Sequence, residues 1–147
     1  MSVRALLNRK ASRVISVETT ASVAAAARLL MKHHIGGLPV VEAGASVVGF
    51  VSERDVVVAV DQHTGNVRDL SVASIMRSPA PFCGSDDEIQ SVMERMTRER
   101  LRHLVVMDGD RLAGVISVGD LVKHRLDQLE IEAGVLRDYV AGQRARR

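Results

Sequence analysis

The chain contains two copies of one sequence pattern, and this duplication limits the folds that are open to it. The segment 34–60 aligns without a gap on the segment 99–125, at a constant offset of 65 positions that matches Asp55 with Asp120. A unit of about 60 residues leaves much of its apolar surface exposed when it folds alone. We therefore expect the two copies to pack against each other around a pseudo-two-fold axis.

Apolar spacing and turn residues predict the same order of elements in both copies. The elements expected in the first copy are a leading helix at 3–10, a strand at 13–17, an Ala-rich helix from the N-cap Ser22 to Gly36 and Gly37, strands at 38–41 and 47–51 around a turn at 42–45, and a helix from Ser52. Those expected in the second copy are a leading helix at 67–76, a helix at 87–98, strands at 103–107 and 111–116, and a helix from Ser117.

This order predicts an α+β fold of two β-α-β-β-α repeats with an extended C-terminal helix. We expect the first repeat at 3–62, the second at 67–126, and a helical extension with a basic tail at 127–147. Apolar residues of the last helix recur at alternating spacings of four and three, at Val122, Leu126, Leu129, Ala133, Leu136 and Val140. Such a seam packs one helix against another, either within the chain or across a subunit contact, and we expect the protein to be a homodimer.

Composition disfavours several classes of protein. Aromatic residues make up 2% of the chain, which is too few for stacking on the bases of single-stranded nucleic acid. The net charge is only +2, and we expect the basic end at Arg144, Arg146 and Arg147 to be a solvated terminus. The longest apolar runs are too short to cross a membrane, no secretory signal is evident, and Cys83 is the single cysteine. We therefore expect a cytoplasmic protein that binds neither membranes nor nucleic acid.

A Ser-x-x-Asp motif stands at a strand-to-helix junction in each copy, at Ser52 and Asp55 and at Ser117 and Asp120. The simplest interpretation is a capping box, in which serine and aspartate bond free amides of the first helical turn. The same geometry also suits a nucleotide. A helix N-terminus attracts a phosphate, and a carboxylate one turn later can accept hydrogen bonds from both hydroxyls of a ribose.

The strings IGGLPVV…VGFVSERD (35–55) and LRHLVVM…AGVISVGD (101–120), within repeated β-α-β-β-α units, resemble the cystathionine-β-synthase (CBS) domain family. Such domains occur as tandem pairs, and the resemblance runs from about Val3 to about Leu126. It implies two clefts between the stacked copies, each of which binds an adenosine derivative. The extension beyond the repeats is similar to that of small bacterial proteins consisting of one CBS pair.

The resemblance also implies which residues line each cleft. In one cleft Ser117 and Asp120 would face Ser16 and the backbone of Ile35, Gly37, Leu38 and Pro39. In the other cleft Ser52 and Asp55 would face Arg102, His103 and Leu104. Arginine binds phosphate through two parallel hydrogen bonds, so Arg102 and His103 would suit a polyanionic ligand.

Two positions depart from the family pattern at the offset of 65. Pro81 would match Ser16, and Leu104 would match Pro39. Because proline offers neither a hydroxyl nor an N–H, we expect the clefts to differ. The Asp120 cleft would bind the adenosine half well. The Asp55 cleft would depend more on phosphate charge, and therefore on salt and on the protonation of His103.

Other candidate groups predict no chemistry. His33 and His34 are adjacent on a helix and cannot form an i, i+4 metal pair. Cys83 has no activating partner nearby in the sequence, and Asp86, Asp87 and Glu88 suit a helix N-terminus without a metal. Almost the whole chain is used by the repeats, which leaves no nucleophile and base for an enzyme.

The sequence therefore predicts a non-enzymatic regulatory protein with AMP, ADP or ATP as ligand, no catalytic cofactor and no metal. An unidentified protein would be the regulated partner. NAD and S-adenosylmethionine share the adenosine part and stay open as ligands. The alternative is a dimerisation or protein-interaction module that works without a ligand.

Overall fold

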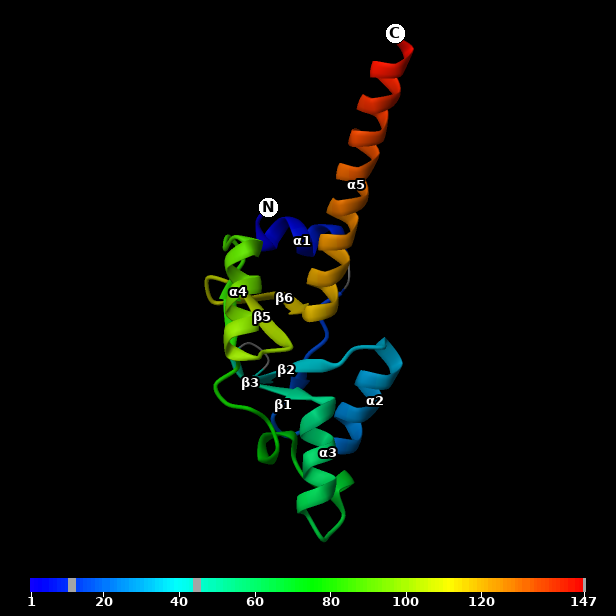
Figure 1. The fold of residues 1–147 in the computed structure, drawn as a ribbon. Coiled ribbons are helices and arrows are strands. Elements are labelled where there is room, and N and C mark those ends of the chain that lie inside the picture. Colours follow the sequence, from blue (N-terminus) through cyan, green and yellow to red (C-terminus); the bar gives the residue numbers. More distant parts are fainter. Residues whose placement is uncertain (11–12, 44–45, 147) are drawn as a thin grey trace.

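Two three-stranded sheets lie face to face, each with its own helices on its outer side (Figure 1). The computed structural model describes residues 1–10, 13–43 and 46–146. The elements are α1 (Val3–Lys10), β1 (Val17–Glu18), α2 (Val23–His33), β2 (Gly37–Glu42), β3 (Ser46–Ser52), α3 (Glu53–Gln62), η1 (Val67–Asp69), η2 (Val72–Ser74), β4 (Phe82–Gly84), α4 (Ile89–Glu99), β5 (His103–Asp108), β6 (Arg111–Ser117) and α5 (Val118–Ala145). The predicted α+β fold is confirmed.

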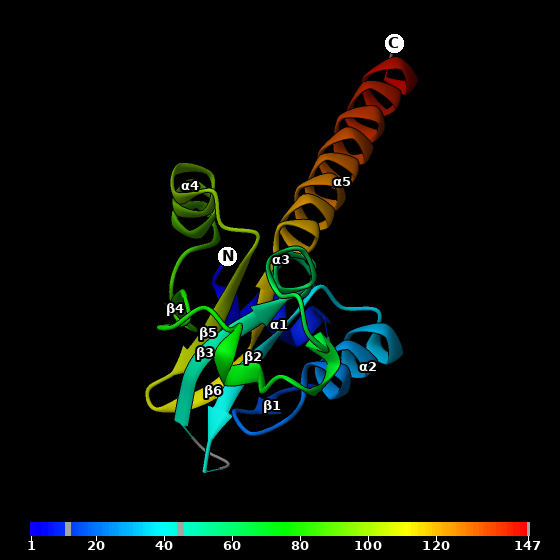
Figure 2. The same ribbon diagram turned by 90° about the horizontal axis from the view of Figure 1, so that it is seen from below.

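Both sheets have the same topology. The strand orders are β1-β2-β3 and β4-β5-β6, with the first pair of each sheet parallel and the second antiparallel. Strands β1–β3 lie in front of β5 and β6 when the molecule is seen from below (Figure 2). Phe50, Ala80 and Val105 form a buried cluster between the sheets. This cluster packs the two repeats face to face.

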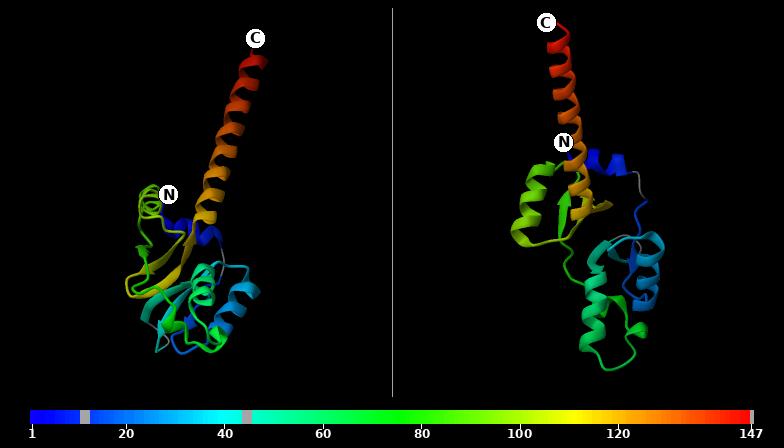
Figure 3. Two further views of the ribbon diagram at one scale, coloured as in Figure 1. Left: turned by 60° about the horizontal axis from the view of Figure 1, so that its bottom comes forward. Right: turned by 45° about the vertical axis from the view of Figure 1, so that its right-hand side comes forward.

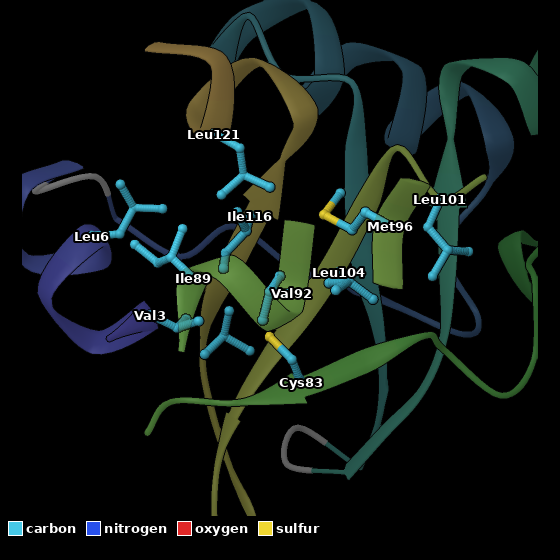
Figure 4. Close-up of a cluster of buried hydrophobic side chains, with 11 residues drawn as sticks. Val3, Leu6, Cys83, Ile89, Val92, Met96, Leu101, Leu104, Ile116 and Leu121 are labelled. Atoms are coloured by element: carbon cyan, nitrogen blue, oxygen red, sulfur yellow. The ribbon is translucent and has the colours of Figure 1, made fainter. Parts of the chain in front are cut away.

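The segment that leads into the first repeat packs on the second repeat. Helix α1 lies beside α4 and α5 (Figure 3), and its Val3 and Leu6 are buried with Ile89 in the core of the second repeat (Figure 4). Backbone amides fix the contact: Val3 N donates to Asp87 O at 2.9 Å, and Arg4 N donates to Ser85 O at 2.8 Å. Helix α1, which we call the leader of the first repeat, therefore completes the hydrophobic core of the second repeat.

The second leader makes the reciprocal contact with the first repeat. Val72 is fully buried in the core beneath β1–β3, and its amide donates to Ala21 O at 2.8 Å. Val23 N donates to Leu70 O, also at 2.8 Å. This leader consists of the two short 3₁₀ helices η1 and η2, so the prediction of one helix at 67–76 is wrong. The repeats are thus joined by an exchange of leaders as well as by their sheets.

The constant offset of 65 is wrong for the first half of each repeat. The parallel pair Val17–Val40 corresponds to Cys83–Val106, an offset of 66. The offset returns to 65 at the Ser-x-x-Asp motifs, because the second hairpin is one residue shorter. Its strands close at Asp108 and Arg111, whereas those of the first hairpin close at Glu42 and Ser46. Residues 44 and 45 of the predicted turn lie outside the described residues.

The prediction that the first long helix ends at Gly36 and Gly37 is wrong, because α2 ends at His33. His34 is its left-handed C-cap, with φ 52°, and Arg100 has the same role in the second repeat, with φ 56°. Gly37 begins β2, where a Cβ would lie 2.4 Å from the Phe50 ring. This glycine therefore serves close packing in the sheet. Strand β1 is also shorter than predicted, because ladder pairing starts only at Val17.

Helix α5 runs for 28 residues and projects well beyond the body (Figures 1 and 3). Its seam is not part of the chain's own core: Val122 is 52% exposed and Leu136 is 62% exposed. Arg144 and Arg146 lie near its exposed end, and Arg147 is outside the described residues. Across the parts of the chain that the structure describes, no helix combines the length and apolarity that a membrane span requires.

The exchanged leader can be tested with Val3→Ala. Two buried carbons are removed and a cavity is left, so we expect the free energy of unfolding to fall by about 1 to 2 kcal/mol. Urea denaturation followed by circular dichroism should show one transition for the whole chain, because the leader joins the repeats. The control Met31→Ala, at a side chain that is 74% exposed, should change the value by less than about 0.5 kcal/mol. An unchanged midpoint for Val3→Ala would contradict the packing.

Candidate functional site: two clefts between the repeats

Two clefts open between the repeats, one at each Ser-x-x-Asp motif. The first cleft contains Asp120, has a volume of about 1020 Å³ and is walled on the other side by residues 32–37. The second cleft contains Asp55, has a volume of about 650 Å³ and is walled on the other side by residues 100–103. Each cleft therefore joins a helix N-terminus of one repeat to the segment after the long helix of the other repeat.

Both motifs form complete capping boxes, which confirms the simplest interpretation of the spacing. Ser117 N donates to Asp120 Oδ2 at 2.9 Å, and Asp120 N donates to Ser117 Oγ at 3.1 Å. At the other motif, Ser52 N donates to Asp55 Oδ2 at 2.8 Å. Within the described parts of the chain, Oδ1 of either aspartate has no hydrogen-bond donor. Capping thus uses one carboxylate oxygen and leaves the other for a ligand.

Lys10 holds Asp120 from the far end of α1. Its Nζ donates to Asp120 Oδ2 at 2.9 Å and to the carbonyl of Val115 at 3.1 Å. Both side chains of the ion pair are partly buried, with 31% and 23% of their surface exposed. The leader that completes the second core therefore also places a cation in the first cleft. An ammonium here neutralises the carboxylate that would otherwise repel an anionic ligand.

Glycines in one cleft are replaced by large side chains in the other. At the observed offset of 66, Gly36 corresponds to Arg102 and Gly37 corresponds to His103. Both pairs line their clefts. The matching hydrogen bonds, Glu53 N to Gly36 O and Val118 N to Arg102 O, are both 3.0 Å long. Gly36 and His103 line both clefts, so the clefts differ at these positions through Gly37, which lines only the first, and Arg102, which lines only the second.

The register also corrects the two expected departures between the copies. Pro81 does not match Ser16, which corresponds to Phe82 instead, and Leu104 matches Leu38, not Pro39. The expected inequality of the clefts therefore rests on the wrong residues. Gly37 in the first cleft and Arg102 in the second give the inequality a different basis, which is the size of the side chain at the cleft wall.

His103 lies between the two clefts and lines both of them. Its ring centroid is 5.3 Å from that of Phe50, and its Nε2 lies 3.1 Å from where a Cβ on Gly36 would be. Burial lowers the pKa of this imidazole. Asp120 and Glu53 oppose that shift, whereas Lys10 and Arg102 add to it. The free protein therefore holds His103 neutral to a lower pH than an exposed histidine.

The structure brings together most of the residues that the sequence singled out. Ile35, Gly37, Ser117 and Asp120 line the first cleft, and Ser52, Asp55, Arg102 and His103 line the second. Leu38, Pro39 and Leu104 have fully buried side chains, and Ser16 is exposed outside the lining of either cleft. For Leu38 and Pro39 the expectation concerned the backbone, so their burial does not decide it.

Sequence reasoning missed most of the cations in the clefts. Lys10, Arg13 and Lys32 line the first cleft, and Arg54, Arg77 and Arg100 join Arg102 in the second. Both clefts therefore suit anionic groups, so positive charge alone does not distinguish them. Only Arg54, inside the Ser-x-x-Asp motif, could have been found from the sequence. The others come from leaders and helix ends that only the tertiary fold brings to the clefts.

The remaining candidate groups have structural roles. Asp86 pairs with Arg4 at 3.2 Å, and Asp87 Oδ2 accepts from Gly84 N at 2.9 Å. Burial raises the pKa of the Cys83 thiol to about 11, so the group stays protonated and unreactive near neutral pH. Among the described residues, no three His, Cys, Asp or Glu side chains cluster closely enough to hold a metal ion.

Comparison with known proteins shows the family. The CBS domain model matches residues 3–62 and 72–127, so the chain belongs to the CBS domain family as a tandem pair. A CBS-domain containing protein of Agrobacterium tumefaciens is 38% identical, with a TM-score of 0.79 and coverage of 85% of this chain and 99% of that one.

Two further relatives are associated with AMP. A CBS domain protein of Pyrobaculum aerophilum, solved in complex with AMP, is 28% identical, with a TM-score of 0.76 and coverage of 90% of this chain and 99% of that one. The 5′-AMP-activated protein kinase subunit gamma-3 of Bos taurus is 29% identical over 111 residues, which cover 71% of this chain and 22% of that protein. CBS pairs of this kind are generally regulatory modules.

The environment of His103 predicts how stability depends on pH. Its pKa is lower in the folded chain than in the unfolded one, so the unfolded state binds more protons as the pH falls below about 6.5. Its contribution to stability is complete above that pH and is lost progressively below it. We expect His103→Gln to lose less stability than the wild type between about pH 7.5 and about pH 5.5 in thermal melts. Equal losses in the two proteins would contradict the burial of a neutral imidazole.

Proposed function

We propose that this protein is a cytoplasmic, non-enzymatic sensor that binds AMP, ADP or ATP in the clefts between its two repeats. One observation carries the proposal: Asp120 and the Gly36-Gly37 pair come from different repeats and line one cleft. A bound ligand would therefore touch both repeats at once. The relative from Pyrobaculum aerophilum, solved with AMP, supports a nucleotide as the ligand class.

The first cleft has the groups that a nucleotide requires. The free Oδ1 of Asp120 can accept from the ribose hydroxyls, while Oδ2 keeps its capping bond to Ser117 N. Gly36 and Gly37 line this cleft with backbone, against which a flat base can lie. Lys10, Arg13 and Lys32 supply positive charge for phosphate. A phosphate would also give Lys10 a second anionic partner beside Asp120.

Regulation would follow from how the cleft is built. A ligand stabilises the arrangement of the repeats that it binds more tightly, and it shifts their packing by its difference in affinity. Lys10 belongs to α1 and Asp120 belongs to α5, so a ligand at this pair would act on both helices. Since α5 also carries the exposed seam, we infer that the protein is a homodimer whose subunit contact reports on ligand binding to an unidentified partner.

Two matched variants test the nucleotide site. Asp120→Asn and Asp55→Asn each keep a side-chain oxygen for the capping bond and lose the carboxylate. We expect isothermal calorimetry with AMP, ADP and ATP to show binding to the wild type, loss of the first cleft's binding in Asp120→Asn, and its retention in Asp55→Asn. The melting temperature of the wild type should rise with nucleotide, because the ligand binds only the folded state.

The contrary result is a wild type that folds and melts cooperatively but shows neither heat of binding nor a shift in melting temperature with any of the three nucleotides. The two Ser-x-x-Asp motifs would then serve only as helix caps. The chain would then be an interaction module that works without a ligand.

The unequal clefts give a second prediction. In the Asp120→Asn background, Arg102→Gly with His103→Gly gives the second cleft the glycine pair of the first. We expect adenosine, which lacks phosphate, to bind this variant more tightly than Asp120→Asn alone, because the base gains room. The reciprocal Gly36→Arg in the Asp55→Asn background should weaken adenosine binding in the first cleft. Unchanged affinities in both would show that side-chain volume does not distinguish the clefts.

A further inference from the structure

The outer half of α5 is a helix without a packing partner in its own chain. From Leu129 to Ala145 the described side chains are exposed, including Leu129 at 44% and Val140 at 42%. A helical segment without packing contacts is only weakly stable in water, since most helical stability in proteins comes from packing. Gly134, with no neighbour within 4 Å of where a Cβ would lie, weakens it further. The segment therefore needs an external partner.

The seam points away from the body. Leu121 and His124 are buried against the second repeat and Gln128 is half-buried, so these residues mark the side of α5 that contacts the chain itself. The seam residues Val122 and Leu126, on the same turns, are more than half exposed. In a heptad with the seam at positions a and d, the body-facing residues occupy positions c and f. A second helix can therefore reach the seam without displacing the body.

We propose that the seam of α5 pairs with the same seam of a second copy as a parallel, two-stranded coiled coil. The proposal rests on the homodimer inferred above and adds its interface and orientation. The seam fills positions a and d in the order Val122 (d), Leu126 (a), Leu129 (d), Ala133 (a), Leu136 (d) and Val140 (a). Charges at the flanking positions g and e then decide how the two helices run.

In the parallel arrangement each g residue meets the e residue five positions later in the other helix. Arg125 then faces the partner's Glu130, and Glu132 faces the partner's Arg137. Both contacts join opposite charges, and the two-fold symmetry makes each of them twice. All four side chains are exposed on the helix, so they are free to make these pairs.

The antiparallel arrangement that aligns the same seam joins like charges. With Leu129 opposite the partner's Ala133, Glu132 faces the partner's Glu132, and Glu130 faces the partner's Glu130. Exposed pairs are individually weak. Both parallel pairs are nevertheless attractive and both antiparallel pairs are repulsive, which favours the parallel orientation over this antiparallel one.

A second apolar stripe on α5 provides an internal control. Ile131 and Val135 are 59% and 65% exposed and, at heptad positions f and c, continue the body-facing side of the helix away from the seam. Tyr139, which is 63% exposed, follows at position g. They match the seam in exposure, and they differ from it in lacking the alternating four and three spacing. If the seam is the interface, charges placed on the seam should dissociate the dimer, and charges placed on the second stripe should not.

Light scattering of the full chain tests the interface. We expect the wild type to be a dimer of 16.0 kDa subunits, Leu129→Glu with Leu136→Glu to be monomeric, and the control Ile131→Glu with Val135→Glu to remain dimeric. Circular dichroism checks that each variant is folded. A monomeric wild type, a dimeric seam variant, or dissociation by the control alone would each overturn the proposal.

Oxidative cross-linking tests the orientation. Gln143 is the next d position after the seam, and Gly142 lies beside it on the other face of the helix. Gln143→Cys should form an intermolecular disulfide rapidly in the parallel arrangement, whereas Gly142→Cys should not. The buried Cys83 does not compete, and the wild type serves as the blank. A dimer that fails to cross-link at Gln143→Cys, or that cross-links equally at Gly142→Cys, would overturn the parallel orientation.

Nucleotide binding is an independent measurement on the same variants. The clefts lie within one chain, so the monomeric seam variant should still bind nucleotide if the proposed function holds. Absence of dimerisation with nucleotide binding intact would contradict the coiled coil alone. Absence of nucleotide binding with dimerisation intact would contradict the proposed function alone.

Discussion

The exchange of leaders is the contact on which the rest of the structure depends. Val3 and Val72 are both fully buried, and each lies in the core of the repeat that its own segment does not precede. Neither core is complete without a residue contributed by the other leader. The exchange also fixes how the repeats face each other, and thereby brings Asp120 opposite Gly36. Lys10 reaches Asp120 only because α1 crosses to the second repeat.

Local patterns in the sequence predicted the elements, and tertiary contacts decided what the patterns could not. The duplication, the paired strands and the capping boxes depend on short-range spacing, and they were predicted correctly. The helix ends were not, because His34 and Arg100 adopt a left-handed backbone that glycine usually supplies. The shorter second hairpin was missed because the repeats align without a gap from Gly49 and Gly114 onward, where the motifs are strongest.

The candidate site was predicted in the same uneven way. Asp55 and Asp120 carry a motif, so their place at helix N-termini followed from the sequence. Lys10 carries no motif, and its role depends on a contact across 110 positions of the chain. The sequence predicted unequal clefts because a constant offset of 65 aligns Pro81 with Ser16. The strand register has an offset of 66 there and aligns Ser16 with Phe82. The observed contrast depends on side-chain size at two aligned positions, and only the strand register identifies those positions.

His103 has a consequence for how the two clefts work together. The imidazole forms part of the wall of both clefts, so a ligand that moves it in the first cleft alters the shape and charge of the second. Thermodynamic linkage makes this effect reciprocal: each occupant changes the affinity of the other by the same factor. Protonation of the imidazole would enter the same linkage if both clefts held a ligand, because His103 lines both of them. The pair of clefts would therefore respond to nucleotide concentration and acidity as a single coupled device, not as two separate receptors.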